Sequence, residues 1–215
     1  MKQLIIITLF ASIMFADTII VDQSGSGDYT TISDAVSNAS NGDIIEVHSG
    51  LYMENVLIED KELTINGAGS SSTTIYTSLV AIESTNSILT ISGFKIWSIS
   101  TTALSAWSDT PVGNLIVSDC LIISDGFYVV HIVNIETATF SDCTMEGNSD
   151  DNMFVTGTDL NVINSTISSG YQGIYATNSS ALNIINSTIS DMTRGITTVD
   201  GSTANITNSI ITSSI

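Results

Sequence analysis

Four polar side chains that could act together on a sugar recur at regular spacing near the end of the chain. Asp150, Gln172 and Arg194 follow one another at intervals of 22 residues, and Asp151 lies beside the first of them. A carboxylate, an amide and a guanidinium in one stripe could bind a polysaccharide, or could supply a nucleophile and support for a developing oxyanion. The alternative is a solvated turn, because residues 148–152 have the composition of an ordinary loop.

A second pair of carboxylates, Asp119 and Asp142, precedes this stripe in the sequence. If successive repeats stack as neighbouring strands, the two carboxylates lie ~4.8 Å apart. That spacing would raise the pKa of one of them or bind a cation, for which calcium is the natural choice outside a cell. It also resembles the carboxylate separation of retaining glycosidases. The structural alternative is a pair of turn residues.

Each of these aspartates is followed by a cysteine, Cys120 or Cys143. Stacked strands would bring the two cysteines within the Cα separation that a disulfide needs, and an exported chain could form one. A pair of stacked free thiols explains the spacing equally well. Zinc binding is disfavoured because neither a histidine nor a third cysteine lies nearby.

Aromatic and hydroxyl side chains give two further candidate surfaces. Trp97, Trp107 and Tyr171 could stack against sugar rings, or could pack their loops onto the core. The threonines at 144, 166 and 188 form a short hydroxyl column of the kind found in ice-binding surfaces, which is a minor alternative function.

The element that must position all of these residues is a repeat of about 22 residues. Residues 160–168 (LNVINSTIS), 182–190 (LNIINSTIS) and 204–212 (ANITNSIIT) share one plan, with Leu160, Val162 and Ile167 facing inward and Asn161 and Ser168 outward. Earlier copies align on a column with intervals of 26, 26, 23, 22, 22 and 22 residues, namely Gly67, Gly93, Asp119, Asp142, Asn164, Asn186 and Asn208. This period predicts an all-β protein, a right-handed parallel β-helix in which inward residues stack into aliphatic columns.

The two ends of the chain have different signals. Lys2 followed by the apolar run Leu4–Phe15 predicts a signal peptide over residues 1–16, so that the β-helix domain spans 17–215. Residues 31–39 predict a short amphipathic helix with a Thr31–Asp34 capping pattern that covers the first coil. The last repeat stops without a cap, which indicates that the domain continues further or is truncated.

Charge narrows the choice of partners. The chain carries 22 acidic and four basic residues, a net charge of −18, and this field repels nucleic acid and anionic membranes. No second apolar run is long enough to span a bilayer, so no membrane span is expected in the mature protein. A polyanionic glycan would need a bridging cation, and calcium is the only cofactor suggested.

Three stretches resemble known proteins: residues 21–36 (VDQSGSGDYTTISDAV), 50–56 (GLYMENV) and 63–69 (LTINGAG). They are similar to the pectin-lyase-like β-helix superfamily, and the opening is closest to pectin methylesterases and to non-catalytic parallel β-helix repeat proteins. The catalytic motifs of the pectin methylesterases, pectate lyases and polygalacturonases are absent from the chain. The resemblance implies a secreted or cell-surface protein that binds polysaccharide or serves a structural or adhesive role. The alternative is a polysaccharide-acting enzyme of the pectinesterase, lyase or glycoside hydrolase type that uses the Asp150 stripe.

Overall fold

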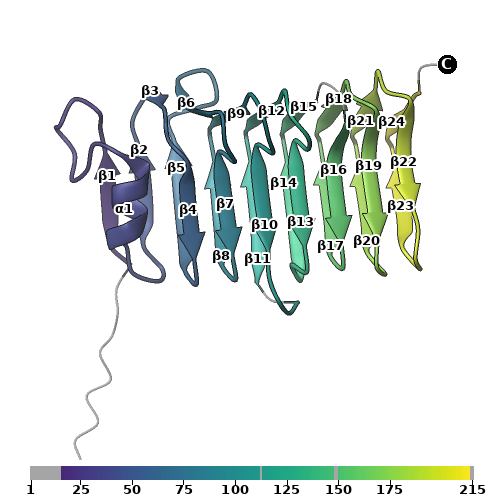
Figure 1. Cartoon of the computed structure of the whole chain (residues 1–215), viewed down its shortest axis with the longest axis horizontal. Coiled ribbons are helices and arrows are strands. Elements are labelled where there is room, and N and C mark those ends of the chain that lie inside the picture. Colours follow the sequence, from purple (N-terminus) through teal and green to yellow (C-terminus); the bar gives the residue numbers. More distant parts are fainter. Residues whose placement is uncertain (1–15, 112, 148–149, 214–215) are drawn as a thin grey trace, which may run out of the picture.

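The computed structural model describes residues 16–111, 113–147 and 150–213 of the chain. They form a solenoid whose coils follow one another along one axis, with the N-terminal and C-terminal coils at opposite ends (Figure 1). The strand pairs of the described residues are parallel, and each coil from β2 to β22 contributes one strand to each of three sheets in turn. The predicted all-β, right-handed parallel β-helix is confirmed.

The three sheets are here named A, B and C. Sheet A contains β1 (Thr18–Val21), β2 (Ile44–Val47), β5 (Glu62–Gly67), β8 (Ile88–Ser92), β11 (Asn114–Ser118), β14 (Thr137–Ser141), β17 (Asp159–Ile163), β20 (Ala181–Ile185) and β23 (Thr203–Thr207). Sheet B contains β3 (Gly50–Tyr52), β6 (Thr73–Thr77), β9 (Lys95–Ser98), β12 (Leu121–Ser124), β15 (Thr144–Glu146), β18 (Thr166–Ser168), β21 (Thr188–Ser190) and β24 (Ile210–Ile211). Sheet C contains β4 (Val56–Glu59), β7 (Ile82–Thr85), β10 (Leu104–Trp107), β13 (Val130–Val133), β16 (Asp151–Thr156), β19 (Gln172–Thr177) and β22 (Arg194–Thr198).

Inward side chains stack in register to form the core, as the repeat predicts. Leu160 pairs with Leu182 and Val162 with Ile184, and all four are buried. The outward neighbours, Asn161 and Asn183, are partly exposed. Because each aliphatic column runs through several coils, burial of one coil depends on the coils at either side.

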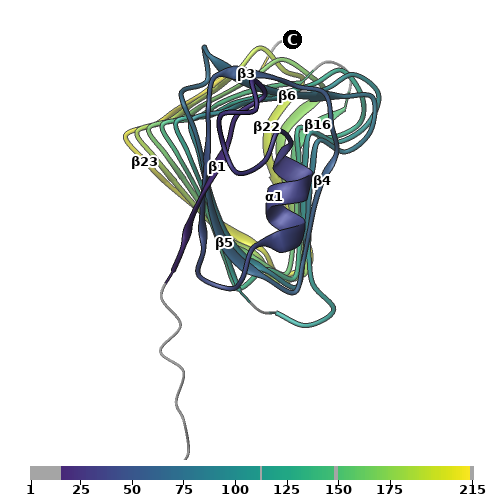
Figure 2. The same ribbon diagram turned by 90° about the vertical axis from the view of Figure 1, so that its left-hand side faces the viewer.

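The predicted capping helix is confirmed as α1 (Ile32–Asn38), which lies across the N-terminal mouth of the solenoid (Figure 2). The hydroxyl of its N-cap residue, Thr31, accepts a hydrogen bond from the Asp34 amide. Glu54 accepts from the first two amides of the helix, and Lys61 donates to the carbonyls of Val36, Ser37 and Ala39 at its other end. The negative charge of Glu54 at the N-terminus of α1 and the positive charge of Lys61 at its C-terminus therefore both interact favourably with the helix dipole.

The corner between sheets A and B is built the same way in coil after coil. From β8 onward two residues link each sheet A strand to its sheet B strand. The first of them has a positive φ, from 49° at Asn208 to 73° at Gly93, in a region open to glycine and tolerated by Asn and Asp. This explains the predicted column of turn residues from Gly93 onward, namely Gly93, Asp119, Asp142, Asn164, Asn186 and Asn208. The first predicted member, Gly67, is instead the last residue of β5. Side-chain amides also bond along it, with Asn186 Nδ2 donating to Asn164 Oδ1 at 3.3 Å.

The corner between sheets B and C varies instead. Its linkers run from three to five residues, for example 125–129 before β13, 147–150 before β16 and 169–171 before β19. No helix in the described part of the chain is long and apolar enough to cross a membrane. The predicted signal peptide lies outside the described residues except for its last residue, Ala16.

Candidate functional site

The B–C corner gathers charged and aromatic side chains from four successive coils into one strip. We call it the corner strip, and it consists of Phe127, Tyr128, Asp150, Asp151, Tyr171 and Arg194. Backbone bonds join its coils, because the Tyr171 amide donates to the Asp150 carbonyl at 3.1 Å and the Arg194 amide to the Tyr171 carbonyl at 3.1 Å. Phe127 and Tyr171 expose 63% and 43% of their surface, so the strip is open to a ligand.

The predicted stripe is present, but its register is displaced by one residue. Asp151 pairs with Gln172, which pairs with Arg194, whereas Asp150 lies in the linker before β16. The linker before β16 has four residues and the one before β19 has three, while the following linkers, 157–158 and 178–180, have two and three. The longer linker before β16 is balanced by the shorter linker after it. The repeat therefore stays 22 residues long, although β16 begins one residue later in its repeat than β19 does in the next.

Gln172 does not join the open part of the stripe. Its side chain is only 2% exposed, and its Oε1 accepts a hydrogen bond from Thr197 Oγ1 at 2.9 Å. A buried amide with a partner holds two coils together and cannot touch a surface ligand. The expectation that Gln172 acts beside the carboxylates is therefore not supported by its position.

Asp151 has the most perturbed carboxyl group of the strip. Partial burial and then the negative charge of Asp150 raise its pKa to about 6, against a smaller lowering by Arg194. The same two carboxylates, together with burial as the largest cause, raise the pKa of Tyr128. The Arg194 guanidinium lies over the Tyr171 ring, with 5.5 Å between its carbon and the ring centroid. Asp151 can therefore exchange a proton near neutral pH, beside a stacked cation.

A buried amide lies beneath this strip. Asn152 is fully buried; its Nδ2 donates to the Ser169 carbonyl, while its Oδ1 has no hydrogen-bond donor among the described residues. Gly147 and Gly170 flank it, and a Cβ on Gly147 would stand 2.9 Å from this Oδ1. The strip thus holds two carboxylates and an unsatisfied carbonyl oxygen, an excess of acceptors over donors.

The repeat architecture is matched among known families. A family model described as the right-handed β-helix region matches residues 78–214, well over half of the chain. The chain belongs to the right-handed β-helix family. No curated protein sequence matches it.

Solved structures with a similar fold include several pectin methylesterases. The enzyme from carrot superposes with a TM-score of 0.60 at 15% identity, covering 89% of this chain and 82% of the enzyme. The deglycosylated enzyme from Aspergillus niger has a TM-score of 0.59 at 17% identity, with 91% and 84% covered. The enzyme PemA from Erwinia chrysanthemi has a TM-score of 0.50 at 11% identity, with 88% and 80% covered. At these identities the likeness concerns the fold, and it agrees with the superfamily resemblance of the N-terminal segments.

Within this β-helix, sheet C also carries an aromatic ladder that the sequence analysis missed. His131, Phe154 and Tyr175 pair in register on β13, β16 and β19, and Tyr128 packs on the first two with ring centroids 5.4 and 5.3 Å away. Phe154 and Tyr175 stack with 5.5 Å between centroids. Burial lowers the pKa of His131, which favours its neutral form. The sequence pattern that could have revealed this ladder is one outward-facing ring in each of three successive coils. The one-residue shift of β16 breaks its 22-residue spacing.

The predicted aromatic platforms do not converge. Trp97 lies on sheet B, where Lys95 Nζ stands 4.6 Å from its ring and its Nε1 donates to Asp125 at 3.0 Å. Trp107 ends β10 on sheet C and is 37% exposed. Only Tyr171 belongs to the corner strip. Since the described neighbours of Trp97 already occupy its ring face and its N–H, its position favours the packing interpretation.

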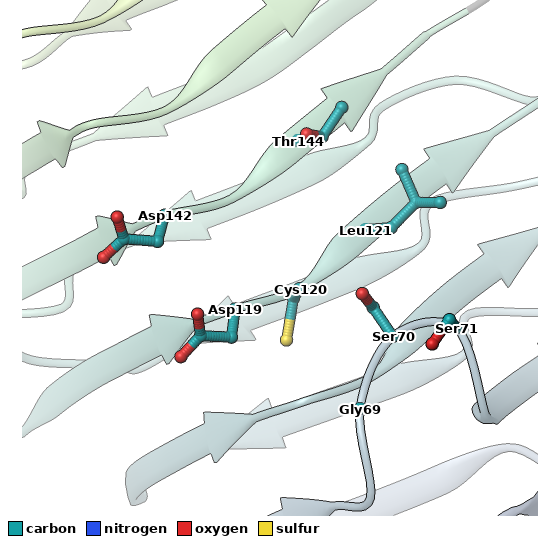
Figure 3. Close-up of a pocket in the computed structure, with 8 residues that line it drawn as sticks. All are labelled: Gly69, Ser70, Ser71, Asp119, Cys120, Leu121, Asp142 and Thr144. Carbon is teal, nitrogen blue, oxygen red and sulfur yellow. The ribbon is translucent and has the colours of Figure 1, made fainter.

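Asp119 and Asp142 lie at the A–B corner beside a shallow hollow of about 470 Å³ that the loop Gly69–Ser71 also lines. Figure 3 shows both carboxylates projecting the same way from neighbouring coils. Both side chains are exposed turn residues with φ of 52° and 54°. No group of three or more His, Cys, Asp or Glu side chains in the described ranges could hold a metal ion. A calcium ion at this pair stays a prediction.

Cys120 and Cys143 are stacked, buried free thiols in the structure, so the alternative of a disulfide is not formed. Each sulfur contacts a carbonyl two residues earlier, Cys120 that of Ser118 at 3.2 Å and Cys143 that of Ser141 at 3.3 Å. Ser165, at the same place in the next coil, makes the same contact with Ile163 at 2.8 Å. Burial raises the pKa of the two thiols to about 12 and about 11, which makes them unreactive.

The hydroxyl column of the minor ice-binding alternative is present but short. Thr144, Thr166 and Thr188 pair in register on β15, β18 and β21. Leu121 precedes them in the column and Ile210 follows. Three threonines between two aliphatic residues make a small array.

Proposed function

We propose that this β-helix binds a polysaccharide along the corner strip. The observation that carries the proposal is that Asp150, Asp151 and Arg194 share one strip with the exposed rings of Phe127 and Tyr171, and that these residues come from four successive coils. Sugars are bound by carboxylate and guanidinium groups that exchange hydrogen bonds with hydroxyls, next to aromatic rings that cover their apolar faces. Away from this strip, the aspartates at the A–B corner repeat as turn residues, which a structural role explains.

A second candidate function is hydrolysis of a polysaccharide or of an ester on it. It is favoured by Asp151, whose pKa of about 6 allows it to give or take a proton near neutral pH. The neighbouring Asp150 carboxylate and the Arg194 guanidinium could then support charge that develops on the substrate. We rank binding first because Gln172, which would complete such a site, is buried with its own partner.

The proposed setting is outside the cell or on its surface, in a structural or adhesive role. The N-terminal run from Leu4 to Phe15 after Lys2 supports export. Export would be tested by expressing the full chain in its native host, fractionating the culture and determining the N-terminus of the recovered protein. Cleavage after Ala16 and recovery outside the cytoplasm are expected.

The function is tested by incubating residues 17–215 with neutral, basic and acidic polysaccharides, with and without calcium. Bound fraction, reducing ends, unsaturated products and released methanol are measured together. We expect saturable binding without turnover, and a weakening of about tenfold in Asp151→Asn, the change expected when one charge-assisted hydrogen bond is lost. The matched control is Asp142→Asn, which removes a carboxylate from the other corner of the same coil.

The outcomes separate the candidates. Turnover that Asp151→Asn abolishes and Asp142→Asn does not would replace binding by catalysis at the same strip. Binding that both variants weaken equally would show that the strip is not the site. A lack of both binding and turnover with every polysaccharide would overturn both candidates.

A further inference from the structure

The charge distribution of the corner strip restricts what kind of glycan fits it. Four basic residues face 22 acidic ones in the chain, and each of the three that lie in the described residues is already engaged. Lys61 donates to three carbonyls at the end of α1, and Lys95 lies over Trp97. Arg194 lies over Tyr171. The carboxylates of a uronic acid chain would therefore meet a repelling surface with few free cations.

The strip itself carries uncompensated negative charge. The one ion pair among the described residues joins His48 and Asp22, so neither Asp150 nor Asp151 has an ion-pair partner there. Asp150 Oδ1 accepts the amide of its neighbour Asp151 at 3.1 Å. Two carboxylates beside one guanidinium leave a net charge near −1, which a ligand cation would neutralise.

A second observation, independent of the carboxylates, points the same way. Asn152 is fully buried under the strip, and its Oδ1 has no hydrogen-bond donor in the part of the chain that the structure describes. Gly147 and Gly170 pack directly against this amide, because a Cβ on Gly147 would stand 2.9 Å from its Oδ1 and a Cβ on Gly170 3.2 Å from its Nδ2. A fully buried acceptor without a partner is rare in folded proteins and indicates a donor supplied from outside, by the ligand or by a water it holds.

Aromatic side chains complete the environment that an ammonium group prefers. Tyr128 is close enough for Asp150 and Asp151 to raise its pKa, and Phe127 precedes it in the same linker. An ammonium group has three donors and no acceptor, and is bound by carboxylates together with the faces of aromatic rings. A neutral hydroxyl would satisfy the same acceptors with fewer donors and no charge.

We propose that the glycan bound at the corner strip is a basic one, an aminosugar polymer whose free amino groups are held by Asp150 and Asp151. This inference rests on the proposed binding function and names the substrate class of the same site. The protonated amine lies between the two carboxylates, and the aromatic rings cover the adjoining sugar. Arg194 opposes the amine and so limits affinity.

The test compares oligosaccharides of equal length and β-1,4 linkage by isothermal titration calorimetry, at low salt with EDTA present. The probes are glucosamine, N-acetylglucosamine, glucose and galacturonate oligomers, the last with its own α-1,4 linkage. We expect the glucosamine oligomer to bind about tenfold more tightly than its acetylated counterpart, equivalent to one charge-assisted hydrogen bond. The double variant Asp150→Asn/Asp151→Asn removes this preference, and the matched double variant Asp119→Asn/Asp142→Asn, with the same net charge, keeps it.

Two further measurements make the inference specific. Arg194→Gln strengthens binding of the glucosamine oligomer, whereas it would weaken binding of a uronate. An N-trimethylated glucosamine oligomer keeps its charge at every pH, so its affinity rises as Asp151 ionises through pH 6. A flat profile over that range would contradict the role of Asp151.

The outcomes distinguish this inference from the function on which it rests. Equal affinity for glucosamine, acetylated and neutral oligomers, lost in the Asp150→Asn/Asp151→Asn variant, overturns the basic-glycan inference and leaves the binding function standing. Tighter binding of the uronate overturns it as well. Equal loss in both double variants shows that only the overall charge attracts the amine. Failure of every oligomer to bind overturns both proposals.

Discussion

The two corners at either end of sheet B differ in how strictly they are built. At the A–B corner two residues link every strand pair from β8 to β24, and the first of them is always Gly, Asp or Asn with positive φ. At the B–C corner the linkers vary from three to five residues and carry aromatic and acidic side chains, and the strands β16 and β22 that follow two of them begin with Asp151 and Arg194. Both corners belong to the same coils, so the difference does not come from the repeat itself.

The comparison separates residues that hold the fold from residues free to carry function. A corner whose backbone conformation is fixed in every coil sets the register of the sheets, and its residue types follow from that conformation. A corner whose length varies imposes no rule common to all coils, although φ is positive at Ser169 and Asp191 in two of its linkers. The side chains of Asp150, Asp151 and Arg194 at this corner do not belong to the repeating turn column, which is why we place the proposed binding function there.

The largest expected effect comes from a glycine at the A–B corner. Gly93 has φ of +73°, and a Cβ on it would stand 2.5 Å from the Gly67 carbonyl oxygen of the previous coil. Because that atom is backbone and cannot rotate away, Gly93→Ala combines left-handed strain with overpacking. We expect a loss of about 3 kcal/mol or more in the free energy of unfolding, measured by urea titration.

Gly42 provides the matched control. Its φ of +91° is also positive, but a Cβ there would meet nothing within 4 Å. Gly42→Ala should therefore cost only the backbone strain, about 1–2 kcal/mol. Equal losses in the two variants would show that close contact between coils does not restrict the A–B corner.

A smaller effect is expected at Asn164, in the same column. Asn164 has φ of +50° and accepts a hydrogen bond from Asn186 Nδ2 at 3.3 Å. Asn164→Val places a β-branched residue in the left-handed region and should destabilise the chain by about 1–2 kcal/mol. Asn164→Asp, which reproduces the residue of two earlier coils, should stay within about 0.5 kcal/mol. A valine variant as stable as the aspartate variant would contradict the explanation of this column.

This strictness explains how much of the fold the sequence predicts. The turn column and the aliphatic columns repeat because each coil packs against neighbouring coils of the same shape. Periodicity alone therefore predicts both the solenoid and its inward residues. The helix over the first coil is predicted by its own pattern, since Thr31 and Asp34 cap it locally. The hydrogen bonds of Glu54 and Lys61 to the two ends of α1 could not be predicted, because these side chains come from segments that follow the helix in the sequence.

The candidate site is predicted less well for the opposite reason. Counting 22 residues from Gln172 leads to Asp150, whereas the sheet pairs Gln172 with Asp151, because one residue moves from the B–C corner to the next corner. The same shift hides the ladder of His131, Phe154 and Tyr175. Burial of Gln172 also depends on neighbouring coils rather than on its own repeat.

The substitution Asp151→Asn tests whether this carboxylate at the B–C corner lowers the stability of the fold. Asp151 has a pKa of about 6 in the folded chain, above the value of about 3.9 in an unfolded one. The folded chain therefore binds this proton more tightly, so the cost of burying the charge is fully present above pH ~6 and absent below ~4. Asp151→Asn should stabilise the chain at pH 7.5, by less than about 1 kcal/mol because solvent screens a half-exposed carboxyl.

The measurement is the difference in free energy of unfolding between Asp151→Asn and the unaltered chain at pH 7.5 and pH 4.5. We expect the gain to shrink at the lower pH, since the carboxyl of the unaltered chain is then largely protonated. Asp142→Asn serves as control, because its exposed turn carboxylate should give no such gain. A variant that is less stable at pH 7.5 would mean that Asp151 supports the fold, and the contrast between the corners would fail at its central residue.

The smallest effect is expected at the second position of the A–B corner, where two coils with cysteine, Cys120 and Cys143, are followed by coils with serine. Ser165 accepts the Cys143 amide at 3.1 Å and donates to the Ile163 carbonyl at 2.8 Å, whereas Cys143 donates weakly to Ser141. Cys143→Ser should place a hydroxyl that accepts the Cys120 amide of the coil before it and donates to the Ser141 carbonyl of its own coil, which offsets the lost burial of sulfur. We expect a change within about 1 kcal/mol in urea titration, and a larger loss for Cys143→Ala, which keeps neither group. A serine variant as unstable as the alanine variant would mean that the uniform corner depends on the sulfur itself, and not on the hydrogen bonds shared by its coils.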